Sequence, residues 1–139
     1  INDYEKLLEI AELLLKGVNE SPYGRSAIYY KAFALRNLGK MDEAKEVYKE
    51  AIKTLRRITV NEPGNIDAYL FRVLCHKDLE EFNEAIEILN YVITLDDRNA
   101  EAHVMLSSIY KETGEINKAK EHFIKAKELK PNINVENLF

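Results

Sequence analysis

The residues most able to do chemistry in this chain are three histidines and one cysteine, and their spacing does not form a catalytic or metal site. His76 directly follows Cys75, but neighbours on a helix point about 100° apart, so the pair is not a nucleophile with its base. His103 and His122 belong to no close ligand motif such as HExxH. We therefore interpret the histidines as structural or surface residues and Cys75 as a buried, inert thiol.

Other signatures of catalysis are also missing from the sequence. There is no glycine-rich phosphate loop and no GxSxG motif, and Ser107 and Ser108 read as small residues within a helix. Two pairs of adjacent acids fall at predicted helix ends or turns, where such side chains are usually solvated. They are Glu80–Glu81 and Asp96–Asp97. The sequence therefore predicts a protein that is not an enzyme and that binds no cofactor and no metal.

The composition favours a protein built from helices that have one polar face and one apolar face. Of the 139 residues, 32% are charged and 46% are apolar, which suits amphipathic helices. The net charge of −4 argues against nucleic-acid binding, which usually needs a basic surplus. Lys53, Arg56 and Arg57 form a local basic cluster. We interpret it as a solvated helix end, where cations complement the helix dipole, rather than as a phosphate site.

The cellular setting follows from what the chain lacks. With Cys75 as the one cysteine, no internal disulfide forms, and nothing argues for secretion. No apolar run approaches the roughly 18 residues needed to span a membrane. We expect a cytoplasmic protein with no membrane partner. Ile1 in place of an initiator Met further predicts a processed form or a fragment of a longer array.

Alanine positions show that the chain repeats itself. Ala68 and Ala102 are 34 residues apart, and so are Ala85 and Ala119. A third copy lies upstream, with its Ala44 placed 41 residues before Ala85. Each copy is predicted to form a pair of antiparallel helices. The small alanine side chain at this position would let the two helices approach closely.

The first copy carries seven extra residues after Ala51. Seven residues make about two helical turns, so a helix lengthened by this amount nearly keeps its facing. Pro63 and Gly64 then end it. We predict one continuous helix over 41–60 that is longer than its counterparts in the other copies.

A period of 34 residues built on helix pairs resembles the tetratricopeptide repeat family. That family's pattern places Trp, Leu-Gly and Tyr on the first helix, and Ala, Phe and Pro on or after the second. The Ala and Phe slots here hold Ala44, Ala85, Ala119, Tyr48, Leu89 and Phe123. Lys31 and Arg72 in the Leu slot, and Val73 in the Gly slot, depart from the pattern. The resemblance covers about residues 25–132.

The resemblance implies an all-α fold, a right-handed α-α superhelix of antiparallel helix pairs. About seven helices are expected, over residues 3–19, 25–38, 41–60, 66–79, 82–95, 99–113 and 116–130. We expect a single domain over 1–139, divided into a capping helix at 1–22, repeats at 25–65, 66–98 and 99–132, and a tail at 133–139. Gly39 and Gly114 should end their helices in left-handed backbone. Glu80 holds the equivalent place in the second repeat, which predicts a tighter or strained turn there.

The same resemblance implies where a partner binds, namely the concave wall lined by the first helix of each repeat. The candidate residues are Tyr29, Tyr30, Phe33, Arg36, Asn37, Leu70, Phe71, Leu74, Lys77, Val104, Met105 and Lys111. An amphipathic helix is the natural ligand for such an apolar groove. The alternative is that the first helices are rotated, with Lys31 and Arg72 facing solvent, so that part of this set is ordinary core. Helical spacing alone does not separate the two.

One family subclass grips the acidic tails of heat-shock chaperones with a clamp of Lys, Asn and Arg side chains. The corresponding positions here are Tyr29, Phe33, Phe71, Glu101 and Met105, none of which matches, and this argues against that function. We expect a scaffold that binds another protein or peptide. The alternative is a self-association module that forms homo-oligomers through the groove or the array ends.

The C-terminal tail is more apolar than a free tail needs to be. Ile133, Val135, Leu138 and Phe139 follow the end of the last helix at Pro131. Either the tail folds back on the last repeat or into a neighbouring copy, or it begins the next repeat of a longer array.

Overall fold

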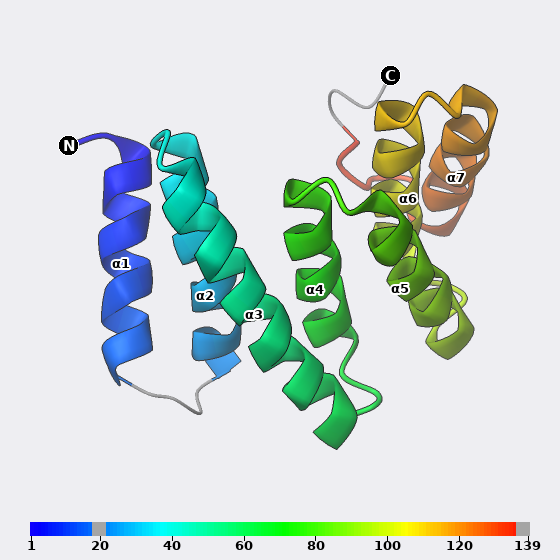
Figure 1. The fold of residues 1–139 in the computed structure, drawn as a ribbon. Coiled ribbons are helices and arrows are strands. Elements are labelled where there is room, and N and C mark those ends of the chain that lie inside the picture. Colours follow the sequence, from blue (N-terminus) through cyan, green and yellow to red (C-terminus); the bar gives the residue numbers. More distant parts are fainter. Residues whose placement is uncertain (18–21, 136–139) are drawn as a thin grey trace. The chain divides into compact units, whose positions relative to one another are not determined.

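The computed structural model describes residues 1–17 and 22–135, and in this part the chain is helical and has no strand (Figure 1). The helices are α1 (Asp3–Gly17), α2 (Pro22–Asn37), α3 (Met41–Asn61), α4 (Ile66–Asp78), α5 (Phe82–Leu95), α6 (Ala100–Glu112) and α7 (Ile116–Leu129). The all-α prediction with seven helices is confirmed for the described residues. The chain divides into two compact units, residues 1–80 and 81–139, and each is described by itself below.

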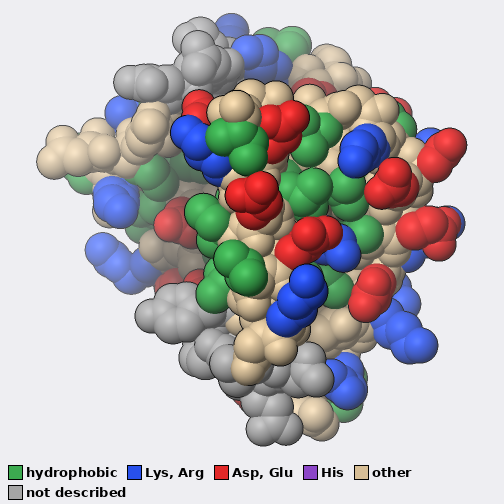
Figure 2. All heavy atoms as spheres, turned by 90° about the vertical axis from the view of Figure 1, so that its left-hand side faces the viewer, with side chains coloured by type: hydrophobic (Ala, Val, Ile, Leu, Met, Phe, Trp, Pro, Cys, Tyr) green, Lys and Arg blue, Asp and Glu red, His purple; other side chains and the backbone are tan. Residues whose placement is uncertain are grey.

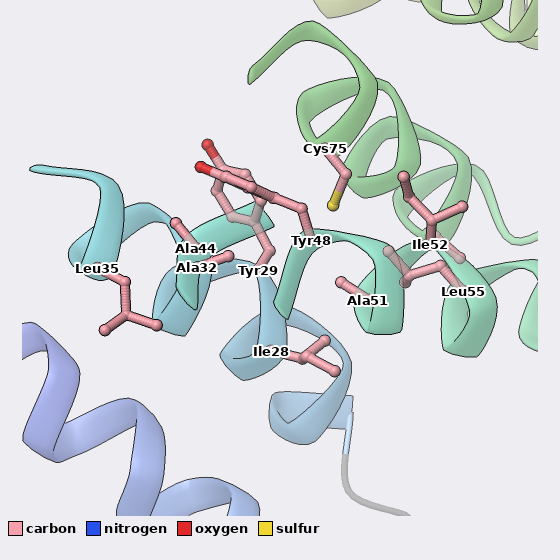
Figure 3. Packing of buried hydrophobic residues seen from close by; sticks show 11 residues of the cluster. Ile28, Tyr29, Ala32, Leu35, Ala44, Tyr48, Ala51, Ile52, Leu55 and Cys75 are labelled. Carbon is pink, nitrogen blue, oxygen red and sulfur yellow. The ribbon is translucent and has the colours of Figure 1, made fainter. Parts of the chain in front are cut away.

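In the first unit, α2 and α3 pack closely because small side chains lie between them. Ala32 of α2 and Ala44 of α3 are both fully buried. Around them lie larger side chains of the same core, among them Tyr29 and Tyr48, whose rings lie near one another (Figure 3). Cys75 of α4 joins this core, and burial raises the pKa of its thiol to about 12. A buried thiol that stays protonated is unreactive, as the sequence predicted.

The lengthened helix of the first repeat is continuous. α3 has 21 residues, whereas α5 and α7 have 14 each. Its extra turns bury Leu55 and Thr59. Just beyond α3, the Glu62 carboxylate accepts two hydrogen bonds from the Arg25 guanidinium, at 2.8 and 3.0 Å, which ties this end to α2. These bonds, with one from Asn65, lower the pKa of Glu62.

The turns that end the first helices adopt left-handed backbone in all three repeats. Gly39 has φ of +81°, and Gly114 has φ of +84°. Glu80 occupies the same place with φ of +60°, the one described non-glycine residue with positive φ. The strained turn predicted at Glu80 is confirmed, because a side chain in this region clashes with the following carbonyl.

In the second unit, α6 and α7 form the closest helix pair. Ala119 of α7 and Ser107 of α6 are both fully buried, and the Ser107 hydroxyl donates to the Ala119 carbonyl oxygen at 2.7 Å. Ala85 of α5 is also fully buried, as predicted. Small residues on both sides of the α6–α7 contact allow the helices to approach until a side-chain hydroxyl reaches the facing backbone.

The beginning of the tail packs on this unit. Ile133 is buried against Ala100 and Ala126, with Val135 beside them. The Lys127 amino group donates to the carbonyl oxygens of Pro131 and Ile133, at 3.3 and 3.4 Å. Ile133 and Val135 therefore fold back on the last helix pair. The two remaining apolar residues of the predicted tail, Leu138 and Phe139, lie outside the described residues.

Candidate functional site

Aromatic rings gather where α2 and α4 meet in the first unit. The ring centroids of Tyr29 and Tyr30 lie 5.2 Å apart, and Phe71 of α4 lies 5.8 Å from Tyr29 and 6.2 Å from Tyr30. These separations are those of attractive aromatic pairs. Tyr29 is buried, Phe71 is half-buried and Tyr30 is 40% exposed. The cluster therefore runs from the core of the unit to its surface.

A cleft of about 340 Å³ opens beside this cluster. Its lining comes from α2, from α4 and from the residue before α4, and comprises Arg25, Ser26, Tyr30, Asn65, Asp67, Ala68 and Phe71. Tyr30 and Phe71 give it an aromatic wall, while Arg25, Asn65 and Asp67 give it polar groups of both donor and acceptor kind. Ligand sites commonly combine apolar walls with a few polar groups in this way.

Two of the polar groups are held in place by local bonds. The Asn65 side chain caps α4 by accepting a hydrogen bond from the Ala68 backbone N–H at 3.1 Å, and it donates to Glu62 at 2.7 Å. Arg25 makes its paired bonds to the same carboxylate. The rim of the cleft is therefore ordered before any ligand arrives, which lowers the entropic cost of binding.

Asp78, at the end of α4, holds three helices together. Its carboxylate accepts hydrogen bonds from the hydroxyls of Tyr48 at 2.6 Å and Tyr29 at 3.3 Å. The Arg36 guanidinium lies 3.4 Å from its other oxygen. Burial, together with this carboxylate, raises the pKa of both tyrosine hydroxyls well above their usual value. The tyrosines therefore stay protonated as donors, and the network fixes α2 and α4 on α3.

The predicted binding residues differ in how far they reach the surface. The buried residues are Tyr29 and Leu70. The partly buried residues are Phe33, Leu74, Phe71, Lys77, Val104 and Met105, and the exposed residues are Tyr30, Arg36, Asn37 and Lys111. Phe33, Phe71 and Leu74 pack against the core of the first unit. Val104, Met105 and Lys111 belong to α6 in the second unit, where Val104 packs against the cluster that includes Ile133. The cleft thus brings together two of the predicted residues, Tyr30 and Phe71.

The predicted set left out Arg25 and Asn65, which also line the cleft. A signal for Asn65 is present in the sequence, because an Asn after Pro63-Gly64 and before an apolar helix is a typical N-cap. The Asp78 network had a weaker signal. A carboxylate in the last turn of a helix opposes the dipole and needs partners, but the sequence does not say which tyrosines supply them.

A second polar contact lies in the second unit, between α6 and α7. The Nδ1 atoms of His103 and His122 are 3.0 Å apart, and the Tyr110 and His122 ring centroids are 5.6 Å apart. Across residues 1–17 and 22–135, no three His, Cys, Asp or Glu side chains gather into a group able to hold a metal ion. Nor does any helix within those residues have the length and apolar character to cross a membrane.

Comparison with known proteins agrees with this architecture. A model of the tetratricopeptide repeat family matches residues 26–54, 66–99 and 100–133, more than half of the chain. No match was found among curated protein sequences.

Solved structures with the same fold share little sequence with this chain. A crystal structure of MamA is 22% identical, over 93% of this chain and 70% of that one, with a TM-score of 0.58. MamA from Desulfovibrio magneticus RS-1 is 20% identical over 96% and 89%, with a TM-score of 0.57. The Yersinia enterocolitica type III secretion translocator chaperone SycD is 19% identical over 91% and 84%, with a TM-score of 0.63.

Proposed function

Because the chain belongs to the tetratricopeptide repeat family, we propose that it is a scaffold that binds a protein partner through the α2–α4 face and performs no catalysis. The single observation that carries this proposal is the cleft between Tyr30 and Phe71. It lies on the first helices of the first two repeats, the helices whose walls bind ligands in this family.

The chemistry of the cleft favours a peptide with one large apolar side chain. Such a side chain would enter the cleft and pack against the Tyr30 and Phe71 rings that line it. There it is removed from water, which contributes roughly 1.5–3 kcal/mol to binding. Peptide N–H and C=O groups on either side would meet Asp67, Asn65 and Arg25 at the rim. An amphipathic helix, with anchors spaced at three or four residues, supplies this combination along one face.

The proposal excludes an acidic C-terminal tail as the ligand of this face. Tyr29, Phe33 and Phe71 stand where a carboxylate clamp needs Lys or Asn side chains. Tyr29 is also buried, with its hydroxyl bonded to Asp78. A carboxylate brought to this part of the face would meet aromatic rings and would lose its hydration, and the Arg25 guanidinium that lines the cleft is already paired with Glu62.

A selection of binding peptides from a random displayed library tests the proposal. The affinity of a selected peptide is then measured by calorimetry for the wild type, Tyr30→Ala and Tyr91→Ala. Tyr91 is the matched control, because it is 44% exposed on α5 while Tyr30 is 40% exposed. We expect Tyr30→Ala to weaken binding about tenfold or more, as a central aromatic anchor does. Equal affinities for all three proteins would contradict the proposal.

Self-association is the second candidate function, favoured by the outer face of α1. Ile10, Leu13 and Leu14 are 55%, 67% and 42% exposed there, although Ala11 and Leu8 of the same helix pack inward. Figure 2 shows hydrophobic side chains gathered on this side among acidic and basic ones. Contiguous exposed apolar surface commonly marks an interaction site.

Leu13→Glu separates the two candidates. If copies of the chain pair through α1, the wild type shows a concentration-dependent dimer in analytical ultracentrifugation, and the variant is a monomer. If the chain is a scaffold for another protein only, wild type and variant sediment alike, while peptide binding through Tyr30 persists in both.

A further inference from the structure

Among the residues that the structure describes, a half-buried arginine on α4 has no acidic partner. Arg72 occupies the slot that the family pattern gives to leucine. One of its terminal nitrogens, Nη1, donates to the Thr59 hydroxyl of α3 at 3.2 Å, and the Thr59 hydroxyl in turn donates to the Arg56 carbonyl oxygen at 3.0 Å. Its Nε is buried and makes no hydrogen bond. A guanidinium removed from water in this way normally has a carboxylate beside it.

The charged side chain that affects the pKa of Arg72 is another cation, Arg56. Burial lowers the pKa of Arg72, and the neighbouring Arg56 lowers it further, while the Tyr69 ring, 5.9 Å away, acts in the opposite direction. Because Arg72 and the Arg56 backbone both bond to the Thr59 hydroxyl, the two arginines lie near one another across the α3–α4 contact. Such an arrangement is unfavourable unless an anion neutralises it.

The sequence next to Arg56 and Arg72 supplies cations and no acids, although Glu50 lies three residues before Lys53. Within four residues on either side of Arg56, the charged residues are Lys53 and Arg57, both exposed. Within four residues of Arg72, the chain has no aspartate or glutamate. The four basic residues thus form a positive patch on a chain whose net charge is −4.

The helix dipole does not account for the patch. Its effect is confined to about the last turn of a helix. The last turn of α3 contains no basic residue, because the helix continues to Asn61. The sequence-based interpretation of Lys53, Arg56 and Arg57 as a charged helix end therefore does not fit the helix as it is built.

We propose that the patch formed by Arg56 and Arg72, with Lys53 and Arg57 beside them, binds an oxyanion carried by a protein partner, either a carboxylate or a phosphorylated side chain. This inference rests on the proposed protein-binding function and adds a second, electrostatic contact, made by residues that do not line the Tyr30–Phe71 cleft. Guanidinium groups suit both anions, because their N–H donors form a planar fork.

The size and setting of the patch favour a protein segment over nucleic acid. The positive charge of four cations suits the negative charge of a few carboxylates or of one phosphate group. A duplex would need basic residues along a longer stripe, and the chain as a whole is acidic. Binding to DNA is therefore an outcome that the experiment must be able to detect.

The probes are three labelled peptides with the same spacing of side chains, rich in Asp and Glu, in phosphoserine, or in Lys, together with a labelled DNA duplex. Binding is measured by fluorescence anisotropy on the full chain. We expect the Asp/Glu peptide, the phosphopeptide or both to bind and the Lys peptide not to bind; the stronger of the two acidic peptides identifies the source of the oxyanion.

Three variants locate the site. Arg72→Leu restores the family residue and should fold well, and Arg56→Gln changes an exposed side chain. Arg98→Gln removes the same charge from an exposed residue of the second unit. We expect a tenfold or greater loss of affinity in the first two and no loss in the third. Tyr30→Ala should leave this affinity unchanged, so a failure here is distinct from a failure of the cleft.

Equal weakening in all three variants would show non-specific attraction and overturn the proposal. So would tighter binding of the duplex than of either acidic peptide, or the absence of binding by both acidic peptides.

Discussion

Glu80 carries a cost that its counterparts avoid. Gly39 and Gly114 end the first helices of their repeats with left-handed backbone, and a Cβ built on either would contact nothing within 4 Å. The requirement at this place therefore comes from the left-handed backbone itself and not from a lack of room for a side chain. Glu80 meets the same requirement with a side chain, which strains the backbone by about 1–2 kcal/mol.

Glu80→Gly should therefore stabilise the protein. Relief of the left-handed strain outweighs the extra freedom that glycine has in the unfolded chain, and a net gain of about 0.5–1 kcal/mol is expected. Chemical denaturation measures it. The reciprocal change, Gly114→Ala, should cost about 1–2 kcal/mol for the same reason. A destabilised Glu80→Gly protein would mean that the carboxylate makes a contact more important than the strain.

Ala119 tests the close packing of the last helix pair. Its side chain is fully buried and its carbonyl oxygen accepts the Ser107 hydroxyl bond. Ala119→Leu should overpack this contact and separate the hydroxyl from the carbonyl, at a cost of about 1–3 kcal/mol. Thermal melting is sufficient to see it. A melting temperature equal to that of the wild type would show that α6 and α7 do not pack through this residue.

At the residue scale, the sequence predicted what the repeat period determines. Burial of Ala44, Ala85 and Ala119 followed from their recurrence, and the backbone at Glu80 followed from alignment with two glycines. Networks that join distant side chains did not follow. Asp78 meets Tyr29 and Tyr48 because three helices converge on it, and no spacing in the chain encodes that meeting.

At the scale of elements, α6 and α7 share a titratable contact. His103 and His122 face each other through their Nδ1 atoms at 3.0 Å, so one ring donates its proton and the other accepts. The Nε2 of His103 is buried without a partner. A bare nitrogen lone pair is less costly there than an unsatisfied N–H, so we infer that His103 carries its proton on Nδ1 and donates to His122.

This pair should make the stability of the protein depend on pH. Burial lowers the pKa of His103, and His122 and Lys125 lower it further. Burial also lowers the pKa of His122, with Glu121 acting against it and Lys125 with it. Both histidines therefore have a lower pKa in the folded chain than the usual value of about 6.5. Below about pH 6.5 the unfolded chain binds more protons than the folded chain, so the free energy of unfolding falls as the pH drops.

Thermal melts between pH 7.5 and pH 5.5 measure this effect. The loss of melting temperature over this interval should be smaller in a His103→Phe, His122→Gln double variant, which removes both titrating groups. An identical loss in wild type and variant would assign the pH dependence to other groups.

The order and type of the helices were the most predictable part of the fold, although α2 begins at Pro22 rather than at residue 25, and the predicted end of the first helix at residue 19 lies outside the described residues. The seven extra residues after Ala51 predicted a long second helix, and α3 runs unbroken to Asn61. The basic cluster is exposed to solvent as expected, but its interpretation as a helix end was wrong, because the last turn of α3 contains no basic residue. Helical periodicity predicts where a helix lies but not which of its faces finds a counter-charge.

At the scale of the whole molecule, the face predicted to bind a partner is part core and part surface. Tyr29 and Leu70 are buried, whereas Tyr30 lies at the surface beside a cleft. The projection from repeat slots did not resolve which neighbouring residues on these helices are core and which are surface. A rotation of one residue position, about 100°, turns a side chain from core to solvent.

We propose that a protein ligand occupies the α2–α4 face of the first unit. Backbone-amide NMR shifts, recorded while a selected peptide is titrated into the full chain, test it most directly. We expect the largest shifts in residues 25–37 and 65–78, around Tyr30 and Phe71, and we expect Tyr30→Ala to reduce them at the same peptide concentration. Largest shifts on α1, α5 or α7, with residues 25–37 unchanged, would contradict it.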